Sequence, residues 1–317
     1  MFACLISACA VTTSQPPTHL IAEVHPGGTQ RIAFSPSGQW LASGGLHGGL
    51  FVWSVAEGVL VHRLKAHRSR VRALAWRDET HLFSVDRKGE LRLHDVESGR
   101  IQTQYSAGPV QAMVLTANRQ RLLLGQGTRV LWIDATSLSV EAHYDVSSKV
   151  ISLAVSVDGN QIAVSTANGR VQVADSSLTR WRELERPTTD ANDLRFSPDG
   201  RTLLAGGWFG LLDWDVDSGT LQTRPTDHFG QVISVDISPD AQRWISLGRH
   251  TDSMLYLIDA RNNHVLRRMQ AHELCGWQAR FSPNGRYVAS AGEEGSIHIF
   301  DLEEPYRPVA RWVDESE

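Results

Sequence analysis

The sequence predicts an all-β protein, a seven-bladed β-propeller of four-stranded antiparallel blades. Three observations predict it. A short pattern, clearest as FSPSGQWLASGG, recurs seven times along the chain, and the hydrophobic residues that open the copies are 39 to 44 residues apart. Each copy contains short apolar runs separated by turn residues. A period of about 40 residues with four strands in each unit is typical of propeller blades.

The seven copies differ in how closely they match this pattern. Near copies lie at 34–45, 196–207 and 281–292, weaker ones at 155–166 and 237–248, and degenerate ones at 76–85 and 115–125. Each opens with a hydrophobic residue; these are Phe34, Trp76, Leu115, Val155, Phe196, Ile237 and Phe281.

The first unit shows how each element is predicted. Its first strand is Gln30–Phe34, and SPSG then makes a turn because proline fixes its own φ while serine and glycine favour turn positions. The second strand is 40–44, and a glycine-rich link leads to the third strand at 50–55. The residues AEG turn the chain into the fourth strand at 59–67. Short runs rich in valine, leucine and aromatic residues, bounded by glycine, serine or aspartate, are typical strands.

The same pattern gives the first strand of every blade, which lines the axis. These strands are expected to begin near Gln30, Val71, Val110, Val150, Ala191, Val232 and Gly276.

The chain ends supply one fourth strand too many. Candidates lie at 18–25, before the first unit, and at 308–315, after the last. A ring is stabilised when its two ends are tied together, because an open last blade leaves sheet edges exposed. We therefore expect 18–25 to complete the last blade and 308–315 to be an extra edge strand or a docked tail.

The repeat resembles that of the WD-repeat (WD40) β-propeller family in divergent form, over residues 19–317. That family's repeat begins near a histidine, matched by His25, His67, His228 and His272, and its third strand ends in Trp-Asp. Here the third strands end in variants such as His94-Asp95, Trp214-Asp215 and Phe300-Asp301. The resemblance implies a propeller that serves as a platform for protein partners.

In that family the histidine, a second-strand Ser or Thr, a turn Asp and the third-strand Trp can form a buried hydrogen-bond tetrad. The turn aspartate is replaced here by His47, Lys88, Asn168, Phe209 and Glu294. We therefore expect no blade to keep all four groups, and expect stability to depend more on packing.

Composition excludes several classes of protein. With 31 basic and 35 acidic residues the formal charge is −4, so no basic excess supports a nucleic-acid partner. Three cysteines, without metal-binding spacing, predict neither a disulfide framework nor a zinc site. No apolar run approaches the ~20 residues of a membrane-spanning helix. We expect no metal and no cofactor.

The first 17 residues are treated as a possible lipoprotein signal remnant and polar tether, and 18–317 as the propeller. Ile6-Ser7-Ala8-Cys9 resembles the bacterial lipobox, whose cysteine receives a lipid. The segment before Cys9 is shorter than a full signal peptide and lacks its basic start. The hypothesis is a periplasm-facing protein anchored in the bacterial envelope through Cys9. The alternative is a cytoplasmic protein with a short apolar N-terminus.

One charged series lies in equivalent positions of consecutive blades. One residue before the turn-opening hydrophobic residue, three blades carry Arg195, Asp236 and Arg280, where other blades mostly carry alanine. Equal register predicts similar height on the axis, so Asp236 should lie within reach of at least one arginine. The series is interpreted as a structural ladder between blades or as a charged pocket in the central channel, which Asp193 and Arg31 could join.

Four residues are candidate partner-binding positions. Trp208 and Phe209 occupy the turn between the second and third strands of the fifth blade, Trp277 opens the first strand of the seventh, and His272 is the histidine of that repeat. Exposed Trp and Arg are favoured interface anchors. The alternative is that these tryptophans pack between blades and the histidines form hydrogen bonds within each blade.

The sequence thus favours a non-enzymatic protein-interaction scaffold with an unidentified partner. The alternative is a small-ligand binder or hydrolase-type enzyme acting at the central channel. A third hypothesis restricts the scaffold to envelope assembly through lipidation. No GxSxG motif, phosphate-binding loop or calcium loop is present.

Overall fold

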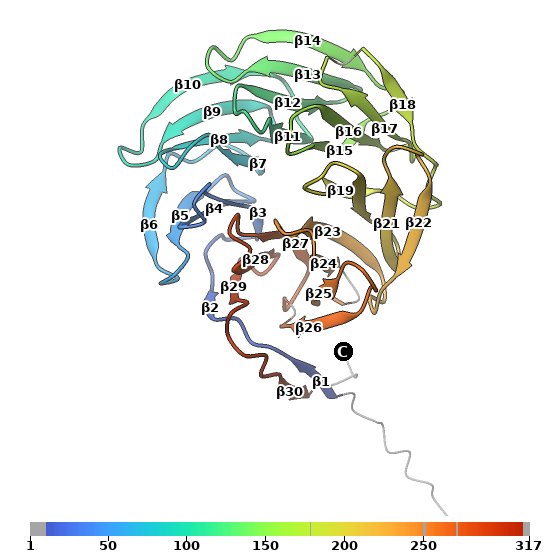
Figure 1. The fold of residues 1–317 in the computed structure, drawn as a ribbon. Coiled ribbons are helices and arrows are strands. Elements are labelled where there is room, and N and C mark those ends of the chain that lie inside the picture. The colour runs from blue at the N-terminus through green and yellow to red at the C-terminus, as the bar shows by residue number, and fades with distance from the viewer. Residues whose placement is uncertain (1–10, 178, 250–251, 271, 313–317) are drawn as a thin grey trace, which may run out of the picture.

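The computed structural model describes residues 11–177, 179–249, 252–270 and 272–312. These residues form seven four-stranded antiparallel sheets arranged as blades around one axis (Figure 1). The prediction of a seven-bladed propeller is therefore confirmed. No described segment forms a helix that is long and apolar enough to cross a membrane.

The first and second strands of each blade form the inner half of the ring. The first strands, from blade 1 to blade 7, are β3 (Thr29–Phe34), β7 (Val71–Trp76), β11 (Ala112–Leu115), β15 (Val150–Val155), β19 (Asn192–Phe196), β23 (Gln231–Ile237) and β27 (Gly276–Phe281). The second strands are β4 (Trp40–Gly45), β8 (His81–Asp86), β12 (Arg121–Gln126), β16 (Gln161–Thr166), β20 (Thr202–Gly206), β24 (Arg243–Arg249) and β28 (Tyr287–Gly292). Three of the expected starts, Val71, Val150 and Gly276, match, and the others differ by one or two residues.

The third and fourth strands form the outer half. The third strands are β5 (Leu50–Ser54), β9 (Glu90–Asp95), β13 (Arg129–Asp134), β17 (Val171–Asp175), β21 (Gly210–Asp215), β25 (Leu255–Asp259) and β29 (Ile297–Asp301). The fourth strands of blades 1 to 6 are β6 (Leu60–Leu64), β10 (Ile101–Ser106), β14 (Val140–Asp145), β18 (Trp181–Glu183), β22 (Leu221–Pro225) and β26 (Val265–Met269).

The N-terminal segment completes blade 7. Strand β2 (His19–Ile21) pairs with β29, so the sheet runs β2-β29-β28-β27. The expectation that residues 18–25 close the ring is confirmed. A fourth strand from the opposite chain end covers the edge that β29 would otherwise expose.

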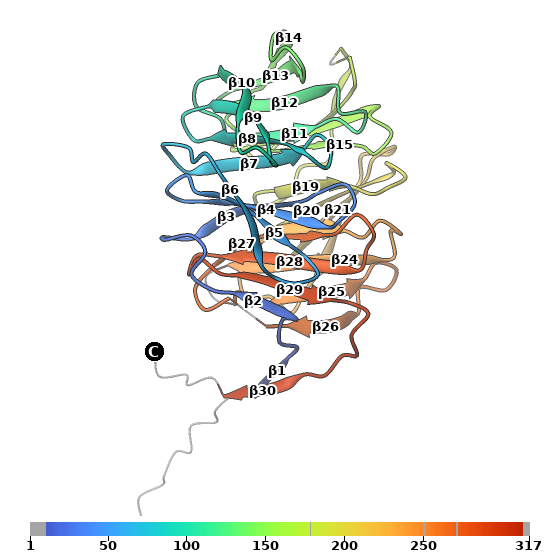
Figure 2. The same ribbon diagram turned by 90° about the vertical axis from the view of Figure 1, so that its left-hand side faces the viewer.

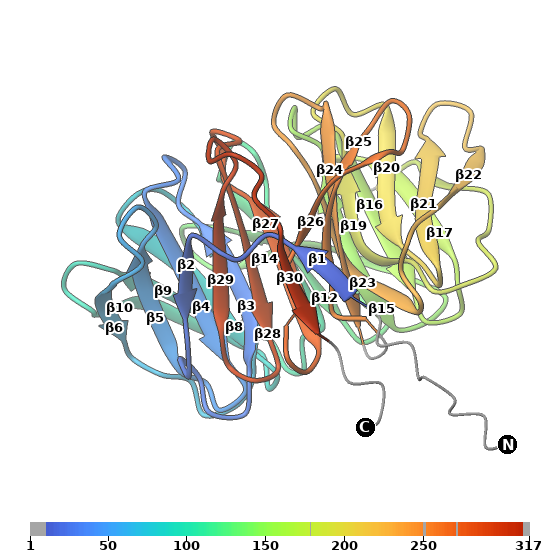
Figure 3. The same cartoon turned by 90° about the horizontal axis from the view of Figure 1, so that it is seen from below.

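A second junction of the chain ends lies outside the ring. Strand β1 (Val11–Ser14) pairs antiparallel with β30 (Val309–Trp312) beside blades 6 and 7 (Figure 3). Gln15 then bonds to β26 through the backbone of Arg268 and Gln270. Ser14 and Gln15 are buried, so this part of the expected polar tether packs against the propeller. Its backbone polar groups can be buried because they pair with those of neighbouring strands. Cys9 and the rest of 1–10 lie outside the described residues.

The core is divided among the blade boundaries. The described residues form seven apolar clusters, and each combines residues of two neighbouring blades. The cluster between blades 7 and 1, for example, joins Ile297 and Ile299 to Leu41 and Trp53. Blades packed on both sides explain why the inner strands are apolar on both faces. Each blade therefore depends on its neighbours.

The meander order gives the ring two different faces, which lie on either side of the edge-on view in Figure 2. One face carries the turns between second and third strands and the links between blades. We call it the His face, because its links contain His25, His67, His228 and His272. The opposite face carries the remaining turns.

Candidate binding surface on the His face

The repeated histidines bond to the second strands of their blades. In blade 1, His25 Nε2 lies 2.9 Å from Ser43 Oγ, which also accepts from Trp53 Nε1 at 2.9 Å. In blade 2, His67 Nε2 lies 2.7 Å from Ser84 Oγ, and His94 occupies the place of the tryptophan. Burial lowers the pKa of His25 and of His67 to about 4, so both rings are neutral near pH 7.

Blades 6 and 7 add a carboxylate to this arrangement. His228 Nδ1 lies 2.9 Å from Asp252, and His272 Nδ1 lies 2.5 Å from Glu294. Burial would raise the pKa of Glu294, but its hydrogen bond with His272 lowers that pKa to about 2. Sequence reasoning missed Asp252, because the turn after β24 is longer than its counterparts and shifts the register.

These contacts show which residues replace the turn aspartate in two blades. Glu294 does the work of the aspartate that it replaces, and Asp252 restores that group in blade 6, where Tyr256 takes the tryptophan's place. No described blade keeps all four family residues together. The hydrogen-bond links are nevertheless present in four consecutive blades, alongside the packing at every blade boundary.

Two groups of these side chains could approach a metal ion: His272, Glu294 and His298, and His67, Asp86 and Glu90. Within each group the ligand atoms lie within 4.8 Å of one another. The rings of His272 and His298 are stacked, with centroids 4.2 Å apart. Stacked rings direct their nitrogens along parallel planes and not toward one centre, while His272 is already bonded to Ser290 and Glu294. The geometry is that of hydrogen bonding within a blade.

His272 is 4% exposed and uses both ring nitrogens inside the blade. Its polar atoms therefore already have partners, which argues against the expected role of His272 as a partner-contact residue. Its surroundings fit the alternative expectation, in which the histidine forms hydrogen bonds within its own blade.

Trp208 and Phe209 lie at the surface of the His face. They are 48% and 59% exposed, and their ring centroids are 5.9 Å apart. The backbone N–H of Phe209 donates to the Gly230 carbonyl, so this turn is joined to the next link, which carries Phe229. Phe229 is 76% exposed. We call these three residues the aromatic edge. Sequence reasoning did not single out Phe229, although its place directly after His228 indicates an exposed link.

Trp277 lies at the mouth of the central channel. The guanidinium of Arg249, from blade 6, is 4.1 Å from its ring centroid, and that of Arg70, from blade 2, is 5.8 Å away. Blade 1 separates blade 2 from blade 7, so the contacts of Trp277 join side chains of blades 2, 6 and 7.

Inside the channel, Asp193 collects more contacts than Asp236. Arg280 bonds to both Asp193 carboxylate oxygens at 2.8 Å, and Arg195 NH2 lies 3.1 Å from Oδ1. Ser234 also donates to Asp193. Burial opposes ionisation of Asp193, but Arg195 and Arg280 outweigh it and hold the pKa of Asp193 well below its usual range.

Asp236 pairs with one arginine of the expected series. Its Oδ1 lies 3.2 Å from Arg195 Nε, and its Oδ2 accepts the backbone N–H of Phe281 at 2.9 Å. Burial raises the pKa of Asp236 against the attraction of Arg195 and Arg280. Arg280 thus turns to Asp193, which lies two blades away, and the series is a linked network across blades 5, 6 and 7.

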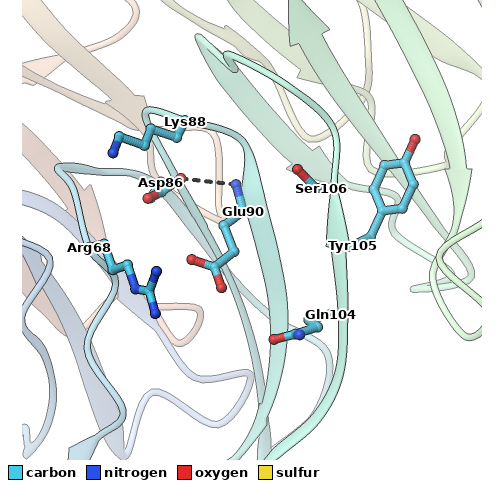
Figure 4. Close-up of a pocket in the computed structure, with 7 residues that line it drawn as sticks. All are labelled: Arg68, Asp86, Lys88, Glu90, Gln104, Tyr105 and Ser106. Carbon is cyan, nitrogen blue, oxygen red and sulfur yellow. Dashed lines mark hydrogen bonds between the residues drawn. The ribbon is translucent and has the colours of Figure 1, made fainter.

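A shallow pocket of about 500 Å³ lies farther out on the His face, at blade 2. Figure 4 shows Arg68 and Lys88 beside the hollow, Asp86 accepting the backbone N–H of Glu90, and Tyr105 pointing away from the other labelled side chains. Arg92 pairs with Glu90 at 2.7 Å. Both acidic residues of the pocket therefore already have partners within blade 2.

The fold and these contacts define a seven-bladed β-propeller in which four blades each contain a buried histidine bonded to a serine of the second strand. The family model described as "WD domain, G-beta repeat" matches residues 19–54 and 263–301. The two segments contain β2 to β5 and β26 to β29, which meet where the ring closes. The match supports a WD-repeat propeller.

Known relatives point the same way. The chain is 24% identical to Autophagy-related protein 16 of Arabidopsis thaliana over 88% of this chain and 48% of that protein. It is 27% identical to WD repeat-containing protein SL1-17 of Schistosoma mansoni over 83% of this chain and 89% of that protein. It is also 27% identical to a guanine nucleotide-binding protein subunit beta of Dictyostelium discoideum, over 58% of this chain and 44% of that protein. The chain thus spans about half the length of the first relative and most of the second.

Proposed function

We propose that this protein is a non-enzymatic scaffold of the WD-repeat type that holds a protein partner on its His face. The aromatic edge carries the proposal. Trp208, Phe209 and Phe229 are three exposed aromatic residues on a turn of blade 5 and the hydrogen-bonded link to blade 6. Large exposed aromatic groups of this kind mark interaction sites, and aromatic residues dominate the binding energy of protein interfaces.

The loops of the same face extend this surface. Leu274, in the link before blade 7, is 57% exposed, and its carbonyl accepts a hydrogen bond from Ser253 of blade 6. Three loops of blades 5, 6 and 7, which carry Trp208 and Phe209, Phe229, and Leu274, therefore present apolar side chains to solvent. The printed names of several relatives, such as a G-protein subunit and a small ribosomal subunit protein, describe parts of larger assemblies, which supports a similar role here.

The alternative is small-ligand binding or catalysis at the central channel, and it has weaker support. A carboxylate that acts as a general acid or base must be free to exchange a proton with the substrate. Asp193 is occupied by two arginines and Ser234, and Asp236 by Arg195 and the Phe281 N–H. The network suits a structural role better than proton transfer.

The test is a quantitative capture experiment with a matched control. The protein and a Trp208→Ala/Phe209→Ala/Phe229→Ala variant are used as bait in lysate of the native cell. A Val59→Ala/Val140→Ala/Val157→Ala variant, which removes three exposed valines from the other side of the ring, is the control. We expect a partner that the wild type and the control retain and the aromatic variant loses. Equal capture by all three baits would contradict the proposal.

The envelope location is a separate proposal, and it rests on the resemblance of Ile6-Ser7-Ala8-Cys9 to the lipobox. The relatives named above are eukaryotic, so they lend bacterial origin no support. The described chain begins two residues after Cys9 with β1, so a lipid on Cys9 would hold the β1–β30 side of the ring near the membrane. Incorporation of a labelled fatty acid, and its loss in Cys9→Ala, tests this location. Unlabelled protein in both cases would favour the cytoplasmic alternative.

A further inference from the structure

Four arginines gather where the central channel opens on the His face. They are Arg70, Arg72 and Arg87 of blade 2 and Arg249 of blade 6, here called the arginine cluster. The N–H of Arg87 donates to the Arg70 carbonyl at 2.8 Å, and Arg70 and Arg249 both lie against Trp277. Arg31 lies next to them and donates to the Arg72 carbonyl at 2.8 Å.

The cluster is short of negative charge. Within the part of the chain that the structure describes, none of its four members has a carboxylate within ion-pair distance, in contrast to Arg195 and Arg280 deeper in the channel. Glu293 is the acidic group whose field reaches Arg70. The chain as a whole carries a formal charge of −4, so this local excess of positive charge runs against its composition.

The arginines also affect one another. Burial, and then the charges of Arg87 and Arg249, lower the pKa of Arg70. Burial, and then Arg70 and Arg87, lower the pKa of Arg72. Like charges held together and partly shielded from water destabilise a fold unless an opposite charge is supplied. An anion at this mouth would relieve that repulsion.

Three polar atoms at the mouth lack a hydrogen-bond acceptor. Nε of Arg72, Nε of Arg249 and Nε1 of Trp277 are enclosed and have no partner among the described residues. Buried polar atoms nearly always have a partner, and those without one call for an explanation. Here all three are donors, and they come from blades 2, 6 and 7. Among the described residues, the channel mouth therefore has more hydrogen-bond donors than acceptors.

The cluster is continuous with the aromatic edge. Trp208 forms a backbone bridge with Gln231, and Gln231 is the register partner of Arg249. A single residue, Gln231, thus separates the backbone of Trp208 from the backbone of Arg249. A ligand that spans this distance must be long enough to touch both an apolar and a basic region.

We propose that the arginine cluster binds the carboxylate side chains of an acidic, aromatic-containing segment of the partner protein. The proposal rests on the proposed function, because it assigns the chemistry of the segment held on the same face. Guanidinium groups pair with carboxylates through two parallel hydrogen bonds, which gives strength and direction. Apolar residues of the segment contact the aromatic edge, while its carboxylates reach the channel mouth. A small anion would use the arginines and leave the aromatic edge unoccupied.

Fluorescence anisotropy with labelled peptides tests the proposal. One peptide alternates glutamate with phenylalanine, and its control replaces every glutamate with glutamine. We expect the glutamate peptide to bind at least ten-fold more tightly, with affinity that falls as salt is raised. An Arg72→Gln/Arg249→Gln variant should weaken the glutamate peptide by about ten-fold or more and leave the glutamine peptide unchanged, since charged hydrogen bonds are the strong ones.

Arg100→Gln/Arg201→Gln is the matched control, because it removes two exposed arginines from the opposite face and changes the net charge equally. Arg70→Gln/Arg87→Gln tests the same cluster independently should the first variant fail to fold. Wild-type affinity in both cluster variants would overturn the proposal. So would displacement of the glutamate peptide by an equal concentration of inorganic phosphate, which would assign the mouth to a small anion.

The outcome is separable from that of the proposed function. If the aromatic variant loses its partner while Arg72→Gln/Arg249→Gln retains it, the scaffold stands and carboxylate recognition is refuted. If the aromatic variant and the wild type capture alike, the proposed function fails, whatever the peptides show.

Discussion

Arg280 holds Asp193 with both terminal nitrogens of its guanidinium, and each nitrogen lies 2.8 Å from a carboxylate oxygen. Arg280 belongs to blade 7 and Asp193 to blade 5, so the pair passes over blade 6. Asp193 has a φ of 52°, a left-handed conformation that aspartate and asparagine adopt more readily than most residues. The backbone thus turns at this position and directs the carboxylate toward a strand two blades away.

The first prediction concerns this pair. Asp193→Ala should lower the free energy of unfolding by about 3–5 kcal/mol, because it leaves Arg280 and Arg195 partly buried without their main counter-charge. Asp193→Asn should cost less, since it keeps hydrogen bonds and tolerates the backbone angle. Asp236→Ala should cost about 1–3 kcal/mol, because Arg195 retains Asp193. Urea denaturation measures all three, and a larger cost for Asp236→Ala than for Asp193→Ala would contradict this order.

The second prediction concerns pH. Burial lowers the pKa of His25 and His67 to about 4 and that of His94 and His298 to about 3. The unfolded chain therefore binds more protons than the folded one below the ordinary histidine pKa of about 6.5, and stability falls as the pH is lowered. We expect the melting temperature to decrease steadily from about pH 6.5 to about pH 4.

The control for the pH experiment is His67→Asn, which removes one of these groups. Its melting temperature should depend less on pH over the same range, although it is lower near pH 7 because the bond to Ser84 is lost. A melting temperature that rises on acidification between these pH values would refute the prediction.

The third prediction compares two turn glycines that share a left-handed conformation. Gly89 has a φ of 87°, and a Cβ atom there would lie 1.6 Å from the Gly108 carbonyl oxygen. Gly127 has a φ of 57°, and nothing lies within 4 Å of its Cβ position. Gly127→Ala should cost about 1–2 kcal/mol for the backbone angle alone. Gly89→Ala should cost clearly more, because the link between blades 2 and 3 must move; equal melting temperatures would show that the clash is relieved without cost.

The fourth prediction concerns the carboxylate in blade 6. Asp252 accepts from His228 and from the backbone N–H groups of Phe229 and Met254. Asp252→Ala should cost about 1–3 kcal/mol because these donors lose their acceptor. Asp227→Ala, which breaks only an exposed pair with Arg268, should cost less than about 1 kcal/mol. Chemical denaturation compares the two, and similar losses would show that Asp252 does not secure its turn.

The sequence predicts the ring better than its surface chemistry, and the reason is periodicity. Val71, Val150 and Gly276 could be placed as strand starts because seven copies reinforce one register. Asp252 could not, since a longer turn displaces it from that register. Arg70 and Arg249 are neighbours of Trp277 only through the closed ring, and no spacing along the chain records a contact between blades so far apart in sequence. The alternating arginines of HRSRVR at 67–72 were a usable signal. The equal register of Asp236 and Arg195 was enough to predict that they lie close together. The pairing of Asp193 with Arg280 could not be predicted, because it depends on the left-handed backbone conformation of Asp193.

The pairing of β2 with β29 has a consequence for the order of assembly during translation. The backbone N–H of Asp301 donates to the Thr18 hydroxyl oxygen, a contact between residues 283 positions apart. Ribosomes release the N-terminal segment first, so it must wait unpaired until nearly the whole chain has emerged. Blades 1 to 6 can form as local meanders meanwhile. The ring cannot close before the codons for the strands of blade 7 have been translated. A nascent chain halted there would present the open edge of blade 6 and an unclaimed N-terminal strand to its surroundings, which are the two surfaces a chaperone would have to cover.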